Sequence, residues 1–323
     1  MTRASLAAAL LSILATQSHC TSQADRERAR VERLKCLTQG LTSDDRDRRE
    51  AAVEDIGALG PKARSALPAL VIALHNARGQ ADLERLIFEA MGRMGPEVAP
   101  TAVPAIVRIV QIDRDLEGDA RAVLHKLGAP AESALQKVLA EAKVWQVRAQ
   151  AARLLTEAHD KKADAALVRA LSDSEAGVRK AAAETLGNRG ADIALGPLAK
   201  ALADKAFDVA LTAAAALRSF GKVGIERLQR ASRLSDAAVS LAAARALGKL
   251  MSADERQTLE LTWRAGLRDK RAEVRHAAVR AISSLGREAV QRASSELRRL
   301  SSDPSADVRQ SAEDALAGIE GEW

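Results

Sequence analysis

The chain has 323 residues, of which 47% are hydrophobic, 28% charged and only 2% aromatic, so a core must be built from Ala, Leu and Val. This balance excludes a disordered chain, and 8 Pro with 19 Gly exclude a collagen-like or low-complexity protein. Two Cys exclude a disulfide framework and a cysteine-based zinc site, and the net charge of +6 is a mild basic bias.

Residues 1–24 have the pattern of an export signal. Arg3 provides a positive region, residues 4–15 form an apolar run, and Ser22-Gln23-Ala24 has the small-x-small pattern that signal peptidase accepts. The apolar run is too short to span a bilayer, so we expect no transmembrane segment in the mature chain. Cleavage at Ala24 would leave Cys36 as a free thiol, which we expect to pack as a small apolar residue.

This pattern predicts an exported protein, either periplasmic or secreted. Two alternatives stay open. The signal could end before Cys20 and leave a lipid anchor on that residue, although the preceding residues are a poor lipoprotein motif. The segment could also be a plain leading helix that is kept, in which case the protein is cytoplasmic.

After this segment the sequence repeats with a period of 30–35 residues. The clearest copy, Val-Arg-Lys-Ala-Ala-Ala-Glu-Thr-Leu-Gly, occupies residues 178–187. A match 31 residues earlier and another 31 residues later establish the register. The copies in this register begin at Arg48, Leu83, Leu116, Val147, Val178, Val209, Val239, Val274 and Val308.

Each copy predicts one helical hairpin. Apolar residues recur with the spacing of one face of an α-helix, helix B, as at Val178, Ala182 and Leu186. A second apolar run, helix A, precedes each copy, as at residues 67–74 and 195–202. No segment alternates like a strand, so the fold class is all-α.

These motifs resemble the HEAT-repeat family, including its bacterial short-repeat branch and the HEAT-like repeats of phycobilisome lyases. Helix A ends in Leu-x-Asp, and helix B opens with Val-Arg-x-x-Ala-Ala-x-x-Leu-Gly. The resemblance implies a right-handed α-solenoid, an armadillo-like superhelix of about nine HEAT-like hairpins, over residues 25–323. Such motifs specify a fold and leave activity open.

The repeated charges predict an Asp–Arg ladder with a structural role. An Asp before helix B can cap its free N–H groups, and an Arg in the first turn can pair with an Asp nearby. The ladder, as we define it from the sequence, consists of Asp173, Asp204, Asp236, Asp269, Asp303, Arg148, Arg179, Arg275 and Arg309.

Four copies depart from this pattern. Their Arg place holds Glu84, Glu117, Ala210 and Ser240, whereas Arg49 is the equivalent residue in the first copy. Because stability in a repeat array is local plus nearest-neighbour, the losses at 210 and 240 predict looser coupling between the sixth and seventh hairpins.

The basic excess lies in the last third of the chain. Residues 218–309 carry 19 Lys plus Arg and 11 Asp plus Glu. Our leading hypothesis is a non-catalytic scaffold that holds a protein partner with an acidic surface on the concave helix-B face. We expect no cofactor, and the oligomeric state is open. The expected contacts are Arg245, Lys249, Arg275 and Arg280.

No catalytic constellation is visible. The five His are isolated, and none forms the paired His-Glu steps that a di-iron hydroxylase built on HEAT repeats would require. A lyase-like HEAT enzyme or its accessory subunit remains an alternative. A cytosolic nucleic-acid-binding protein is a further one, for which Trp145 and Trp263 could stack on a base; we expect both to fill gaps between hairpins and expect no nucleic acid to bind.

Overall fold

The computed structural model describes residues 23–320, apart from the side chains of Lys249 and Glu320. Residues 1–22, which hold most of the expected export signal and Cys20, lie outside this range. The described residues are helical, with no strand among them. The prediction of an all-α repeat fold is therefore confirmed. The chain divides after Ala131 into two compact units, which we describe separately.

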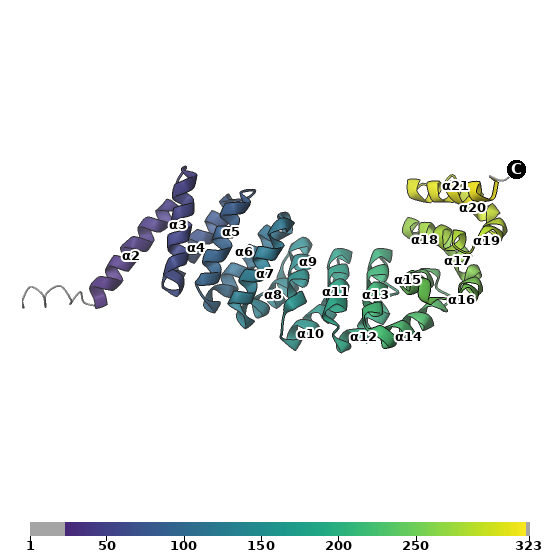
Figure 1. Cartoon of the computed structure of the whole chain (residues 1–323), viewed down its shortest axis with the longest axis horizontal. Helices are drawn as coiled ribbons and strands as arrows, with labels where there is room; N and C mark the ends of the chain where they lie inside the picture. Colours follow the sequence, from purple (N-terminus) through teal and green to yellow (C-terminus); the bar gives the residue numbers. More distant parts are fainter. Residues whose placement is uncertain (1–22, 321–323) are drawn as a thin grey trace, which may run out of the picture. The chain divides into compact units, whose positions relative to one another are not determined.

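The first unit is a stack of helical hairpins (Figure 1). Its 3-10 segments lie at junctions between helices. The helices of this unit are α2 (Gln23–Gly40), α3 (Arg46–Leu59), η1 (Gly60–Ala66), α4 (Leu67–Asn76), α5 (Ala81–Arg93), η2 (Pro96–Val98), α6 (Ala99–Ile112), η3 (Arg114–Leu116) and α7 (Glu117–Leu127). Helix α8 (Ala129–Glu141) runs across the division between the units.

The second unit repeats the same hairpin. Its first part consists of α9 (Trp145–Leu154), η4 (Leu155–Glu157), α10 (Lys161–Ala170), α11 (Ala176–Arg189), η5 (Asp192–Ala194), α12 (Leu195–Ala201) and α13 (Phe207–Ser219). Its second part consists of α14 (Gly221–Ser232), α15 (Ala237–Leu247), η6 (Gly248–Leu250), α16 (Ala253–Thr258), α17 (Glu260–Gly266), α18 (Ala272–Ser283), α19 (Arg287–Arg292), α20 (Ser294–Leu300) and α21 (Ala306–Glu320).

Within residues 23–320, each of the nine copies begins in the first turn of a helix B or, for Leu116, in the 3-10 turn directly before it. These helices are α3, α5, α7, α9, α11, α13, α15, α18 and α21. Within the second unit they contact one another in order, and α13 also touches α18, two hairpins further on. The helix-B face therefore curves inward at α15.

Small residues allow the B helices to lie close together. Val178, Ala182 and Leu186 of α11 are fully buried, as their spacing predicts. A Cβ on Gly187 would stand 2.7 Å from the Cβ of Ala216 on α13, so the closest contact between the two helices depends on a glycine. Helix α11 ends at Gly190, whose φ of +62° is the left-handed conformation that a helix C-cap favours.

Two features differ from the sequence-based expectation. Helix A is split in the last two hairpins, into α16 and α17 in the eighth and into α19 and α20 in the ninth, and a capping box of Ser252 and Glu255 begins α16. The prediction that Cys36 packs as an apolar residue is wrong: Cys36 is exposed. Among the described residues, helix α2 contacts chiefly α3 and η1.

Candidate partner-binding site

The ladder joins each hairpin to the next through one arginine. The guanidinium of Arg179 in α11 donates to both carboxylate oxygens of Asp204, each at 2.7 Å. Its remaining Nη1 donates to the carbonyl oxygens of Asp173 and Ser174, both at 3.0 Å. Asp204 in turn accepts from the backbone N–H of Ala206, at the start of α13. One arginine side chain thus holds two turns together across the seam, the contact between neighbouring hairpins. We call each such arginine with its partners a rung of the ladder.

The same bidentate pair occurs at two further seams. Arg148 reaches Asp173 at 2.8 and 2.9 Å, and Arg275 reaches Asp303 at 2.7 Å through both nitrogens. The hydrogen bonds from Arg275 hold the pKa of Asp303 below its ordinary value of 3.8. Burial would raise the pKa of Asp173, but the hydrogen bonds from Arg148 outweigh it and the net shift is downward.

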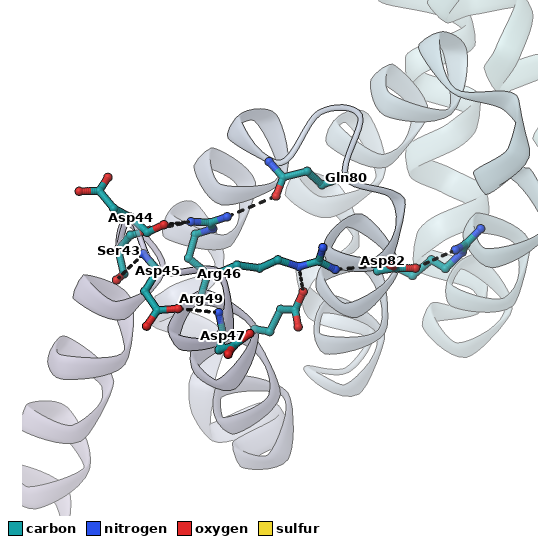
Figure 2. Close-up of polar contacts among 10 residues, drawn as sticks. Ser43, Asp44, Asp45, Arg46, Asp47, Arg49, Gln80 and Asp82 are labelled. Carbon is teal, nitrogen blue, oxygen red and sulfur yellow. Dashed lines mark hydrogen bonds and ion pairs between the residues drawn. The ribbon is translucent and has the colours of Figure 1, made fainter.

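The first seam carries a variant of this rung (Figure 2). Arg49 in α3 donates to the carbonyl oxygens of Ser43 and Asp44, both at 2.9 Å, as Arg179 does one hundred and thirty residues later. A glutamine replaces the aspartate of the next hairpin, and Nη2 of Arg49 lies 3.3 Å from Oε1 of Gln80. The backbone half of the rung is therefore kept where the carboxylate is absent.

The remaining ladder residues have local roles. Asp236 caps α15 by accepting from the backbone N–H of Val239, and Asp269 pairs with Arg271 in its own turn at 2.9 Å. No arginine from the preceding hairpin reaches either carboxylate in the described part of the chain, as the residues at 210 and 240 led us to expect. Arg309, in the last hairpin, binds only the carbonyl oxygens of Asp303 and Pro304.

A buried indole replaces the missing rung at Ser240. Trp263 of α17 is only 2% exposed, and its Nε1 donates to Oγ of Ser240 at 3.2 Å. The hydroxyl of Ser240 donates onward to the carbonyl oxygen of Ser232 at 2.6 Å. Trp145 packs against the next hairpin, since a Cβ on Gly177 would meet its ring at 2.2 Å. Trp145 is nevertheless 39% exposed, so the expectation that both tryptophans fill gaps between hairpins holds fully for Trp263 alone.

Two of the expected contact residues lie at one hollow on the helix-B face. The Arg245 cavity, as we call it, has a volume of about 390 Å³. It is bounded by Leu241, Ala244, Arg245, Gly248, Met251, Arg256, Trp263, Ala277, Arg280, Ala281 and Ser284. Arg245 and Arg280 are exposed, and within the described residues neither guanidinium has a hydrogen-bonding or ion-pair partner.

The other two expected contacts are not free in this way. Arg275 was expected to touch a partner as well as to serve the ladder, but its guanidinium is occupied by Asp303 and by the carbonyl oxygens of Asp269 and Lys270. Its side chain is 13% exposed, so it is a ladder residue and not a surface contact. The side chain of Lys249 lies outside the described part of the structure.

A second hollow, of about 490 Å³, adjoins the Arg245 cavity and shares Arg245 with it. Its charged lining includes Arg218, Lys180 and Glu184, and Lys180 is held 3.4 Å from Asp208. Sequence reasoning missed Arg218, which lies near the end of α13 and is not among the four contacts expected from the sequence.

Arg256 and Met251 were missed for a related reason. They come from α16 and from the turn before it, which the repeat does not describe. No group of three or more His, Cys, Asp or Glu side chains that could hold a metal ion occurs among the described residues.

Comparison with known proteins agrees with the hairpin geometry. A family model for HEAT repeats matches residues 132–218, which correspond to α8 through α13 and contain the rungs of Arg148 and Arg179. No curated protein matches the sequence.

Several solved structures are similar over most of the chain, at 19–20% identity. An engineered protein covers 88% of both chains with a TM-score of 0.32. Human deoxyhypusine hydroxylase in complex with glycerol covers 91% of this chain and 98% of its own, with a TM-score of 0.29. A designed armadillo repeat protein covers 88% and 99%, with a TM-score of 0.27. Superpositions with such scores say nothing about activity. No described helix has the length and apolar character needed to cross a membrane.

Proposed function

We propose that this chain, whose residues 132–218 are HEAT repeats, is a non-catalytic interaction scaffold. It holds a protein partner with an acidic surface on the helix-B face of the second unit, around the Arg245 cavity. The observation that carries this proposal is the pair Arg245 and Arg280, which are exposed, close to one cavity and without a partner among the described residues.

The ladder explains why these two arginines differ from the others. Arg148, Arg179 and Arg275 are each paired with an aspartate of the next hairpin, so their charge is already neutralised. Arg245 and Arg280 lie about one and a half turns beyond the ladder position of their helices, and both are exposed. A guanidinium in that position can form a bidentate pair with a carboxylate from outside.

The charge distribution supports an acidic partner. Arg218 and Arg256 line the two adjoining hollows together with Arg245 and Arg280. The Arg245 cavity has no acidic lining residue, the second hollow has Glu184, and a further hollow that shares Met251 with the cavity is lined by Asp254 and Glu255. An excess of one sign over a concave surface accelerates the association of an oppositely charged protein and selects against others.

Site-specific photocrosslinking in the native cells tests the proposal. A photoreactive benzoylphenylalanine replaces Ser284, which is exposed at the rim of the Arg245 cavity, and in a control it replaces Lys162, exposed on α10. We expect a discrete adduct at 284 only, to a protein segment rich in Asp and Glu. That adduct should disappear when Arg245→Glu and Arg280→Glu are added.

An adduct that survives the double reversal would contradict the proposal, as would the same adduct at position 162 or none at position 284. Circular dichroism of the double variant establishes that helicity is unchanged. A milder pair, Arg245→Gln and Arg280→Gln, guards against the cost of placing two acidic side chains in the last turns of α15 and α18.

We propose in addition that the partner is met outside the cytoplasm, because residues 1–24 have the pattern of an export signal. The mass and first residue of the protein from its native cells test this. A chain that starts near Asp25 in an envelope or secreted fraction is expected. A chain that still carries its leader in the cytosol would overturn the localisation.

A further inference from the structure

We infer that the Arg245 cavity binds one anchor of its partner: a peptide segment in which a large apolar side chain lies within about one helical turn of a carboxylate. This inference rests on the proposed function and specifies what the acidic partner must carry besides its charge. It follows from the chemistry of the cavity floor, the charge of its rim and its size.

The floor of the cavity is apolar. Leu241, Met251 and Trp263 contribute to it and are 3%, 5% and 2% exposed. The only polar atom of the indole, Nε1, is already used by Ser240, so Trp263 offers the cavity apolar surface alone. A polar group placed here would lose its water without gaining a hydrogen bond, whereas an apolar side chain would gain from leaving water.

The rim of the cavity is basic. Arg245, Arg256 and Arg280 are its charged lining residues, and none of the residues that bound the cavity is acidic. The Nε of Arg256 is engaged by the carbonyl oxygen of Ser252 at 3.4 Å. Arg245 and Arg280 are therefore the two groups best placed to receive a carboxylate at the entrance.

The volume of about 390 Å³ is near the lower end of the range for pockets that bind small ligands. A cavity of this size accommodates one or two side chains of a protein partner, which is how a few buried anchors carry most of the energy of many interfaces. The side chain of Met251 can adjust to anchors of different shape. Leu, Met, Phe or Trp should all be accepted.

The cavity lies where the repeat departs from its own pattern. Ser240 occupies the place that an arginine holds at Arg148, Arg179 and Arg275, and it receives the indole of Trp263 instead. The indole that replaces the rung also forms part of the floor. The departure from the repeat at Ser240 thus removes an Arg–Asp link and, through Trp263, contributes apolar surface to the cavity.

Selection from a random-peptide display library with the purified full chain tests this inference. We expect the enriched peptides to share an Asp or Glu and, within about four positions, a Leu, Met, Phe or Trp. Replacing that apolar residue of a selected peptide with Ala should weaken its binding at least ten-fold. Arg245→Glu with Arg280→Glu should abolish enrichment.

A variant of the protein gives a second readout. Ala281→Phe fills the cavity from α18 without changing charge, and should remove the advantage of the apolar residue while leaving a purely acidic peptide unaffected. The matched control is Ala306→Phe, at an exposed position in the first turn of α21. This control should bind like the unaltered chain.

The outcomes separate the inference from the proposed function. An acidic consensus without an apolar position, or equal binding after Ala281→Phe, would overturn the anchor and leave the acidic partner standing. An apolar consensus without acidic residues would overturn both, and so would enrichment that persists in the double arginine variant. Failure to enrich any peptide would also count against both.

Discussion

Arg179 and Asp204 form a bidentate ion pair between the fifth and sixth hairpins, with side chains only 5% and 10% exposed. The arginine belongs to α11 and the aspartate to the turn that starts α13. Because Arg179 also binds two carbonyl oxygens of its own turn, the pair ties the backbone of one hairpin to that of the next. Such links are nearest-neighbour terms in the stability of a repeat array.

Replacing Asp204 with Ala should destabilise the second unit by about 3 kcal/mol, because it leaves the Arg179 charge buried without its carboxylate. The matched control is Arg309→Ala, since Arg309 makes the equivalent two backbone contacts but pairs with no aspartate among the described residues. That change should cost about 1 kcal/mol. Urea unfolding measures the loss of unfolding free energy in both variants. Hydrogen exchange should show faster opening of α11 and α13 only in the Asp204 variant. Equal losses in the two variants would rule out a special role for the pair.

The ladder also predicts how stability depends on pH. Burial alone would raise the pKa of Asp204, but the hydrogen bonds from Arg179 and from the backbone N–H of Ala206 lower it below 3.8, its ordinary value. A carboxyl whose pKa is lower in the folded state stabilises the fold above pH 3.8, and this stabilisation is lost as the pH falls through the folded-state pKa.

We therefore expect the difference in unfolding free energy between the unaltered chain and Asp204→Asn to be largest near pH 7. It should shrink below pH 3.8. A difference that stays constant between pH 7 and pH 3 would show that the charge of Asp204 contributes nothing.

Glu84 predicts the opposite dependence in the first unit. It occupies the Arg place of the second copy, is fully buried, and neither of its carboxylate oxygens has a hydrogen-bond partner among the described residues. Burial, helped by the nearby charge of Asp113, raises the pKa of Glu84 above its ordinary 4.5, whereas Arg78, Arg85 and the backbone of Gly79 oppose the shift.

Stabilisation from a neutral Glu84 is complete below pH 4.5 and is lost as the pH rises through the folded-state pKa. Glu84→Gln should match the unaltered chain at pH 4 and exceed it in stability at pH 8. Thermal unfolding of both proteins over this range is the measurement. Parallel stability curves would mean that Glu84 does not change its protonation on unfolding.

Gly187 predicts a steric effect at the closest approach of two B helices. Gly187→Ala places a Cβ 2.7 Å from the Cβ of Ala216, so α11 and α13 must separate, at a cost of about 2 kcal/mol. The control Gly318→Ala lies in helix α21 with no atom within 4 Å of the new Cβ, and should stabilise the protein by about 0.5 kcal/mol. Chemical denaturation of both variants checks the sign. A stabilising Gly187→Ala would contradict the packing.

The repeated features could be predicted because they depend on local patterns that recur. Val178, Val274 and Val308 are all fully buried at the start of helix B, which their register indicates. Arg148 and Arg179 reach the aspartates that the spacing places one hairpin away. At these positions, the burial and the pairing seen in one copy of the repeat also hold in the next.

The features that the sequence did not predict depend on contacts between residues outside the repeated pattern. The floor of the Arg245 cavity needs Trp263 from α17 and Met251 from the turn before α16, and the repeat motif describes neither position. Both a ladder role and a surface role were expected for Arg275, and its ion pair with Asp303 decides between them. The missing partners of Glu84 are likewise a property of its neighbours in space.

The most direct measurement is the dissociation constant of the crosslinked partner segment, prepared as a peptide, for three chains. They are the unaltered protein, the variant with Arg245→Glu and Arg280→Glu, and a control with Lys161→Glu and Lys162→Glu at exposed positions of α10. Both variants change the net charge equally. We predict binding at least ten-fold weaker in the arginine variant alone, which corresponds to about 1.4 kcal/mol or more. Equal weakening in the two variants, or none in either, would contradict a binding site at the Arg245 cavity.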